Sequence, residues 1–331
     1  PGEPGHDTWQ GDDWEHGGAP VWITGSFDPA LNLTYWGVGN PGPDWNAGQR
    51  PGDNLYSDSV VALDADSGEL KWHFQFTPND GYDYDSVQVP VLVDRDWQGK
   101  PAKLMLWANR NGYFYVLDRV TGKFLLGKPF VKVNWSSGLD ENGRPIPTPQ
   151  PDGMPTWPGN QGGTNWYPPS YSPRTDLFYF SAWEDYATIY QAIEQEYVPG
   201  GLFLGGGFSV KVPVHGAPTI GIGRTWPINY WTDEVGHASL MAMDPDTGQA
   251  VWKYEQFDVS DSGMLTTASD LLFTGGREGY LHALDARNGK LLCKVALGGQ
   301  IVMAPVTYMI AGVQFVTVIS GNAMATFALQ D

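Results

Sequence analysis

Cysteine is almost absent from this chain, and its scarcity excludes several kinds of site. Cys293 is the single cysteine among 331 residues, so no intrachain disulfide framework and no cysteine-rich zinc or iron–sulfur site is available. A covalently attached haem is excluded too, because it needs a Cys-x-x-Cys-His motif. The six histidines show no His-Glu-x-x-His motif and no paired spacing, which leaves little support for a zinc hydrolase.

Positive charge is also scarce. The sequence has 19 Lys and Arg residues against 37 Asp and Glu residues, which gives a formal net charge of -18. A nucleic acid or an anionic membrane would repel such a surface, so we expect neither as a partner. An acidic surface suits metal ions or a basic protein partner instead. No apolar run is long enough to cross a bilayer, so we expect no membrane span.

Segments that favour helices are few, and the composition indicates strands and turns. The chain has 42 Gly, 26 Pro and 15 Trp residues, a combination that fits short strands joined by tight turns. Residues 185–196 form the only helix-like stretch, and it is short and weak. The Pro- and Gly-rich stretches 131–160 and 199–214 are predicted to be long loops. The run Gly205-Gly206-Gly207 lacks the strand–turn–helix setting of a dinucleotide site, which disfavours a nicotinamide enzyme.

A repeated turn organises the chain. Each copy places Asp four residues before Gly and after an apolar strand, and the copies are Asp64 with Gly68, Asp118 with Gly122, Asp244 with Gly248, and Asp285 with Gly289. Asp caps such a turn through nearby backbone N–H groups, and Gly supplies positive φ. Trp72 and Trp252 follow two of these turns by four residues and can pack against a neighbouring unit. Repeats of about 40–50 residues are typical of a β-propeller. We therefore predict an all-β chain that forms a single propeller domain over residues 1–331.

The acidic segment, residues 77–86, is the strongest local candidate for a site. It carries Asp80, Asp83 and Asp85 within six residues. Because Asp83 and Asp85 alternate with tyrosines, an extended backbone would point both carboxylates to one face. Two close carboxylates repel each other unless a cation or a shared proton lies between them. The segment predicts either a cation site or, in the simpler interpretation, a solvated acidic loop.

Several motifs, taken together, carry a resemblance to a known family. They are the acidic segment, the run Gly37-Val-Gly-Asn40-Pro-Gly-Pro-Asp-Trp-Asn46, the run Asn109-Arg-Asn-Gly112, the run Gly162-Gly-Thr-Asn-Trp166, and the Trp-ended repeats. With these motifs in family order over essentially the whole chain, the sequence resembles the quinoprotein alcohol dehydrogenases. This is the methanol and ethanol dehydrogenase group that uses pyrroloquinoline quinone (PQQ). The resemblance implies a propeller of eight blades with PQQ and a metal ion on its axis. It also implies oxidation of a small primary alcohol to an aldehyde, with electrons passed to a cytochrome c in the periplasm.

The resemblance implies catalytic and metal-binding roles for three residues. Asp83 matches the catalytic carboxylate, a general base that takes the hydroxyl proton of the alcohol as hydride leaves for the quinone. Asn40 matches a metal ligand whose amide oxygen suits a large cation, although an Asx turn before Pro41 explains it equally well on local sequence. An aspartate at position 85 resembles the lanthanide-dependent branch of the family. The physical reason is that a trivalent ion tolerates one more carboxylate than calcium does. We therefore predict a lanthanide site of Asn40, Asp83 and Asp85, with Ca²⁺ as the alternative.

Four further residues match cofactor contacts of the family. Arg110 matches the arginine that hydrogen-bonds the quinone oxygens, where a fixed cation stabilises charge on the reduced cofactor. Without the family, Arg110 would be an ordinary turn residue. Trp22 matches the indole that forms the floor under the flat cofactor, and packing in the core is its alternative explanation. Asn165 and Trp166 match the segment that contacts the far side of the cofactor.

The N-terminal portion of the family has no match in this chain. In the family, that portion carries a glutamate metal ligand and a disulfide ring between adjacent cysteines. The chain therefore resembles roughly the last five of the family's eight blades. An open propeller leaves strand edges and an apolar blade face unpaired. We therefore expect weak or no PQQ binding by this chain alone, unless a homodimer, a further segment or a new closure of the chain completes the site. The alternatives to an enzyme are a non-catalytic propeller scaffold and an inactive fragment.

Overall fold

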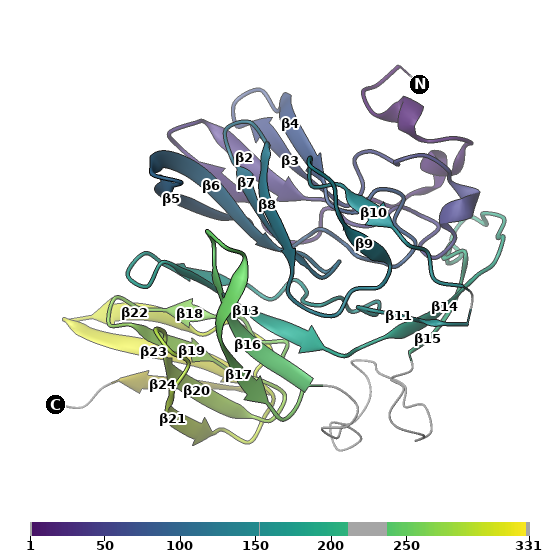
Figure 1. Cartoon of the computed structure of the whole chain (residues 1–331). Coiled ribbons are helices and arrows are strands. Elements are labelled where there is room, and N and C mark those ends of the chain that lie inside the picture. The colour runs from purple at the N-terminus through teal and green to yellow at the C-terminus, as the bar shows by residue number, and fades with distance from the viewer. Residues whose placement is uncertain (1, 152, 211–236, 329–331) are drawn as a thin grey trace. The chain divides into compact units, whose positions relative to one another are not determined.

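The computed structural model describes residues 2–151, 153–210 and 237–328, and antiparallel sheets dominate the regular structure of this part of the chain. These residues form two compact units, and Figure 1 shows strands throughout both. The first unit contains the described residues of Pro1–Trp166 and Asp185–Arg224, and the second contains those of Tyr167–Glu184 and Thr225–Asp331. The predicted all-β architecture is confirmed, whereas a single domain over residues 1–331 stays a prediction.

The first unit holds two sheets of four strands in sequential order and two smaller sheets. One four-stranded sheet consists of β1 (Ser26–Asp28), β2 (Leu33–Gly37), β3 (Ser59–Asp64) and β4 (Leu70–Gln75). The other consists of β5 (Val91–Trp97), β6 (Lys100–Ala108), β7 (Tyr113–Asp118) and β8 (Phe124–Pro129). A hairpin pairs β9 (Ser136–Leu139) with β10 (Pro145–Pro147). A three-stranded sheet places β14 (Thr188–Ala192) between β11 (Pro155–Thr156) and β15 (Gly206–Val210).

The second unit holds three sheets. The first combines β12 (Ser170–Ser172), β13 (Leu177–Glu184), β16 (His237–Asp244) and β17 (Gln249–Gln256). The second combines β18 (Leu265–Thr266), β19 (Leu271–Thr274), β20 (Tyr280–Asp285) and β21 (Leu291–Ala296). The third combines β22 (Val306–Ile310), β23 (Val313–Ser320) and β24 (Ala323–Ala328). With the two four-stranded sheets of the first unit, the described residues therefore contain four sheets of four strands, the size expected for propeller blades, beside the three-stranded sheet of β22, β23 and β24.

The repeated turns form as predicted. The Asp64 Oδ1 atom accepts the backbone N–H groups of Asp66 at 3.1 Å and Ser67 at 2.9 Å. Gly68 follows with φ 73°, a left-handed conformation that glycine adopts without strain. The glycines of the other three turns, Gly122, Gly248 and Gly289, also have positive φ. The turn chemistry read from the sequence is confirmed.

Trp72 packs from one sheet of the first unit onto the turn of the next sheet. A Cβ atom on Gly122 would lie 2.5 Å from Trp72 Cε3, so only glycine leaves room for the indole. The ring centroid of Tyr35 lies 5.6 Å from that of Trp72. The Tyr35 hydroxyl donates to the carbonyl of Arg119 at 3.0 Å, in the same turn as Gly122. The tryptophan of the repeat is therefore a contact between sheets, as predicted.

The second unit repeats this arrangement with different residues. Trp252 lies on Gly289, where a Cβ atom would come within 2.5 Å of the indole. The ring centroid of Tyr179 lies 5.7 Å from that of Trp252, and the Tyr179 hydroxyl donates to the Ala286 carbonyl at 2.9 Å. The same tyrosine–tryptophan–glycine contact thus joins neighbouring sheets in both units.

Helical structure in the described part of the chain consists of three short 3₁₀ helices, η1 (His6–Thr8), η2 (Asp13–His16) and η3 (Ala47–Gln49). None of the described helices is long and apolar enough to span a membrane. The helix expected within 185–196 is wrong, because β14 occupies Thr188–Ala192. Thr188, Ile189 and Tyr190 favour strands, and their partners in β15 lie far along the chain. The stretch 131–160 likewise contains β9, β10 and β11 rather than loop alone.

Candidate active site

The core of the first unit fixes where the acidic segment begins. Phe76 is fully buried and stands directly before the segment. Its ring centroid lies 4.9 Å from those of Trp107 in β6 and Tyr115 in β7. Truncating such a buried aromatic side chain to alanine costs about 3–5 kcal/mol. The start of the segment is therefore anchored on the sheet that β6 and β7 belong to.

The acidic segment is a turn and not an extended strand. The buried Asp80 carboxylate accepts the backbone N–H of Tyr82 at 2.9 Å and that of Tyr84 at 2.8 Å. Asp83 stands between them with φ 65°, in the left-handed region that aspartate tolerates better than most residues. The condition under which both carboxylates would point to one face of an extended backbone is therefore not met, because local bonds from side chain to backbone compete with strand formation.

Asn40, Asp83, Asp85 and Arg110 come together in the first unit. The Asn40 backbone N–H donates to Asp85 Oδ1 at 2.9 Å. Arg110 Nη1 donates to Asp85 Oδ2 at 2.5 Å, and Arg110 Nη2 lies 3.5 Å from Asp83 Oδ2. The side chains of Asp85 and Arg110 are 8% and 5% exposed, whereas that of Asp83 is 23% exposed. Asp83 is therefore the carboxylate of this pair that is more open to a small molecule.

Gly39 allows the Asn40 loop to lie against Asp85. A Cβ atom on Gly39 would lie 2.3 Å from Asp85 Oδ1, so any other residue would displace the carboxylate. The Gly39 N–H donates to the carbonyl of Pro20 at 2.9 Å, which brings the segment that carries Trp22 beside this loop. Trp22 is 42% exposed. Packing in the core, the alternative explanation for Trp22, is therefore wrong.

The motif that ends in Trp166 lies against Arg110. The N–H of Gly163 donates to the Arg110 carbonyl at 2.9 Å, and Arg110 Nη2 donates to the carbonyl of Asn160. Asn165 is buried, and its Oδ1 atom accepts the Trp166 N–H at 2.9 Å. The structure thus brings this predicted segment to the arginine.

Negative charge is concentrated where water solvates it poorly. Burial raises the pKa of the Asp83 carboxyl well above its usual range, the charge of Arg110 opposes this shift, and the charge of Asp85 adds to it. Burial also raises the pKa of Asp80 to about 6, against the two backbone hydrogen bonds that it accepts. The pKa of Asp44 rises to about 6 for the same reason. Such a cluster is stabilised by a cation.

The donor set suits a hard cation and a quinone. Asp83 and Asp85 offer carboxylate oxygens, and Asn40 offers its amide oxygen, since its Nδ2 atom donates to the Pro41 carbonyl at 3.3 Å. No group of three or more His, Cys, Asp or Glu side chains in the described residues forms a metal site, so a cation here would depend on the Asn40 amide. Arg110 Nε is buried without a hydrogen-bond partner among the described residues. This donor fits an oxygen of a bound quinone.

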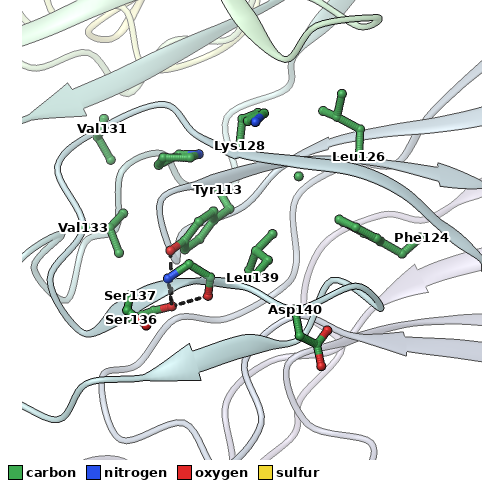
Figure 2. Close-up of a pocket in the computed structure, with 13 residues that line it drawn as sticks. Tyr113, Phe124, Leu126, Lys128, Val131, Val133, Ser136, Ser137, Leu139 and Asp140 are labelled. Atoms are coloured by element: carbon green, nitrogen blue, oxygen red, sulfur yellow. Dashed lines mark hydrogen bonds between the residues drawn. The ribbon is translucent and has the colours of Figure 1, made fainter.

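Two cavities in the first unit are lined by none of the seven predicted site residues. One, of about 580 Å³, is lined by β7, β8 and residues 131–140, and Figure 2 shows the Tyr113 hydroxyl hydrogen-bonded to Ser136 Oγ at its wall, at 3.2 Å. The other, of about 340 Å³, is walled in part by Tyr82 and Tyr190. The Tyr190 hydroxyl donates to the Tyr82 carbonyl at 2.9 Å, so the second cavity borders the acidic segment.

Sequence reasoning missed two buried charged residues near the cluster. Arg50 is fully buried and donates to the carbonyls of Pro43 and Asp44. Asp58 is fully buried as well, and neither of its carboxylate oxygens has a hydrogen-bond partner among the described residues. Its backbone N–H donates to the Gly39 carbonyl at 3.0 Å. Neither residue stands in a recognisable motif, so only the fold reveals them.

Comparison with known proteins decides the family. Residues 1–145 match the family model described as glucose/ethanol/alcohol dehydrogenase, beta-propeller domain, and residues 236–329 match the one described as outer membrane protein assembly factor BamB. Quinoprotein alcohol dehydrogenase PedH of Pseudomonas putida is 41% identical over 332 residues, which cover 97% of this chain and 52% of PedH. The chain belongs to the PQQ-dependent alcohol dehydrogenase family.

Two more comparisons place this family member among its relatives. The 1-butanol dehydrogenase (cytochrome c) of Thauera butanivorans is 38% identical over 283 residues, which cover 82% of this chain and 38% of that protein. A solved structure of a europium-containing methanol dehydrogenase superposes with a TM-score of 0.85 and 33% identity, and covers 96% of this chain and 54% of that chain. The predicted β-propeller architecture and the family resemblance are confirmed. The chain spans about half the length of the curated relatives it matches.

Proposed function

We propose that this PQQ-dependent dehydrogenase chain oxidises small primary alcohols to aldehydes. The observation that supports the proposal is the convergence of Asn40, Asp83 and Asp85 with Arg110 in one partly exposed cluster. A metal-bound PQQ supplies, when present, the acceptor for hydride. The residues of this chain supply the metal ligands, the base and a fixed cation.

Asp83 acts as the general base in this proposal. Its side chain is 23% exposed, so an alcohol hydroxyl can reach it. The proton passes from the alcohol oxygen to a carboxylate oxygen of Asp83 while the C–H bond gives up its electron pair as hydride, and the alcohol becomes an aldehyde. Burial favours the protonated form of Asp83 that results, and Arg110 at 3.5 Å favours the ionised form that must precede it.

The metal that we propose is a lanthanide, with Ca²⁺ as the alternative. Asn40, Asp83 and Asp85 would hold it, and the second carboxylate favours a trivalent ion over a divalent one. The europium-containing methanol dehydrogenase carries a lanthanide in its name, and its structure covers 96% of this chain. This similarity supports the lanthanide in preference to calcium.

Four residues would contact the cofactor. Arg110 would donate to the quinone oxygens, which agrees with its unpartnered Nε among the described residues. Trp22 offers an exposed indole on which a flat ring system can stack. Asn165 and Trp166 lie on the segment that is hydrogen-bonded to Arg110 and would contact the far side of the cofactor.

We also propose a cytochrome c as electron acceptor and the periplasm as the location. The name of the Thauera butanivorans relative includes cytochrome c. The net charge of -18 would attract a basic region on an acceptor. A homodimer is one assembly that would cover exposed blade edges.

The test is a dye-linked alcohol assay on the purified chain with PQQ, run with Ca²⁺ and then with La³⁺. Under conditions in which absorbance shows that PQQ is bound, we expect alcohol oxidation that depends on La³⁺. Asp83→Asn should abolish this oxidation, and Asp85→Ala should remove its dependence on La³⁺. The exposed Asp96→Ala is the matched control and should behave as the wild type. Retained lanthanide dependence in Asp85→Ala would contradict the metal assignment. Inactivity of the wild type with either metal, despite PQQ binding seen by absorbance, would favour the non-catalytic alternatives.

A further inference from the structure

Arg50 lies between the two loops that supply the proposed metal ligands. It is fully buried. Its Nε atom donates to the Pro43 carbonyl at 3.1 Å, and its Nη2 atom donates to the Asp44 carbonyl at 3.3 Å, in the loop that follows Asn40. Nη2 also donates to the Asp80 carbonyl in the acidic segment. One guanidinium therefore joins the backbones of both loops.

Two asparagines fix the position of Arg50. Arg50 Nη1 donates to Asn54 Oδ1 at 2.8 Å, and Asn54 Nδ2 donates back to the Arg50 carbonyl at 3.0 Å. Asn79 Nδ2 donates to the same carbonyl at 2.9 Å and to Asn54 Oδ1 at 3.0 Å. Both the backbone and the head of Arg50 are held, so the guanidinium is preorganised to fix the spacing of the loops.

Asp80 transmits this spacing to the proposed ligands. Its carbonyl accepts from Arg50, and its carboxylate accepts the N–H groups on either side of Asp83. The left-handed φ of Asp83 therefore depends on a turn whose first residue is tied to Arg50. A shift of Asp80 would move Asp83 and Asp85 relative to Asn40.

We propose that Arg50 is a positioning residue that sets the separation between Asn40 and the two carboxylates, and with it the geometry of the cation site. This inference rests on the proposed function. Lysine cannot replace arginine in this role, because an ammonium group at one point does not reach acceptors that lie around a planar fork. Arg50→Lys keeps the charge and removes the fork.

Arg119 provides a matched control in the same unit. It is a second buried arginine, 5% exposed, and its Nε atom donates to Asp28 Oδ2 at 2.7 Å. Its Nη1 atom donates to the Val93 carbonyl at 2.9 Å. These contacts join sheets and include neither the Asn40 loop nor the acidic segment. Arg119→Lys should therefore destabilise the fold without changing the cation site.

The first measurement is the affinity of the full chain for Tb³⁺. Binding is monitored through the Tb³⁺ luminescence that nearby tyrosines sensitise. Arg50→Lys should weaken Tb³⁺ binding by about tenfold or more, the loss typical when a residue that orients a metal ligand is changed. Arg119→Lys should lower the Tm to a similar extent while Tb³⁺ affinity stays at the wild-type value. Wild-type Tb³⁺ affinity in Arg50→Lys, or an equal loss in Arg119→Lys, would overturn the proposal.

The second measurement is hydrogen exchange of the metal-free chain, which does not depend on the proposed function. Arg50→Lys should speed exchange in peptides that cover 38–46 and 77–86, and Arg119→Lys should not. Asn79→Gly removes the hydrogen bond to the Arg50 carbonyl and the one to Asn54, which pairs with the Arg50 guanidinium. It should act in the same direction, since glycine adopts the φ of 51° found at Asn79. If the wild type binds no Tb³⁺, the proposed metal site fails while exchange still decides the role of Arg50. Unchanged exchange in both variants would show that Arg50 does not hold the two loops.

Discussion

Asp85→Asn is the substitution that tests the centre of the site most directly. The Asp85 side chain is 8% exposed, and each of its oxygens has one partner, the Asn40 N–H at 2.9 Å and Arg110 Nη1 at 2.5 Å. Asparagine at position 85 keeps the shape of the side chain and an oxygen that accepts the Asn40 backbone N–H. Its amide group, however, faces a guanidinium with which it cannot pair. The substitution thus removes one charge and leaves the packing nearly unchanged.

The expected loss of unfolding free energy depends on the charges that remain around Arg110. Removing one partner of a buried ion pair costs about 3–5 kcal/mol, because the other charge stays buried. Asp83 still lies 3.5 Å from Arg110 Nη2, so we expect the lower end, about 3 kcal/mol. For a unit of this size, such a loss lowers the Tm by about 6–12 °C.

The assay is urea and thermal unfolding in the presence of EDTA, so that no bound cation contributes its own stabilisation. Asp261→Asn is the matched control, because Asp261 Oδ2 pairs with buried Arg277 at 2.9 Å in the second unit. Both variants should be destabilised, and only Asp85→Asn should lose Tb³⁺ binding. An Asp85→Asn chain within about 1 kcal/mol of the wild type would refute the ion pair as the centre of the cluster.

Three further predictions concern other parts of the chain. Gly39→Ala should abolish Tb³⁺ binding measured by luminescence, because its Cβ atom would lie 2.3 Å from Asp85 Oδ1. Gly289→Ala should lower the free energy of unfolding measured in urea by about 2–4 kcal/mol, since a Cβ atom there both overlaps the Trp252 indole and occupies a left-handed backbone. Burial lowers the pKa of His282 to about 4. The neutral ring therefore stabilises the fold above the unfolded pKa of about 6.5, and this stability is lost as the pH falls toward 4. His282→Phe should accordingly lose less stability between pH 7 and pH 4.5, by about 1 kcal/mol, and an unchanged pH profile would contradict the assignment.

The sequence predicts well those features whose cause is local. Asp64 and Gly68 specify their turn within five residues, so the turn follows from side-chain capping and glycine alone. Thr188–Ala192 was predicted wrongly, because the strand depends on partners in β11 and β15 that lie far away in the sequence. Local propensity is weak evidence wherever pairing over long distances decides the structure.

The site shows the same division between local and distant causes. The family resemblance selected Asn40, Asp83, Asp85 and Arg110, and the fold brings these four together. Their assigned roles stay predictions. Arg50 escaped notice because its acceptors are backbone carbonyls, which carry no side-chain signature in a sequence.

The Asp–Arg pair at the centre of the site belongs to the repeat. Arg110 and Arg277 each stand three residues before the tyrosine that begins a strand, β7 or β20. Each pairs with a buried aspartate, Asp85 in the first unit and Asp261 in the second. A buried Asp–Arg pair is thus a feature of the scaffold in both units, and its presence alone is not evidence for a cation site.

What distinguishes the first unit is the group that faces the pair. In the second unit the Tyr167 hydroxyl donates to the other oxygen of Asp261 at 2.7 Å, so both oxygens of that carboxylate have a side-chain partner. In the first unit the Asn40 loop takes that place, and Asp83 adds a second carboxylate within 3.5 Å of the arginine. One guanidinium then faces two carboxylates, and this excess negative charge favours a cation. The departure from the repeat, rather than the repeat itself, therefore locates the candidate site.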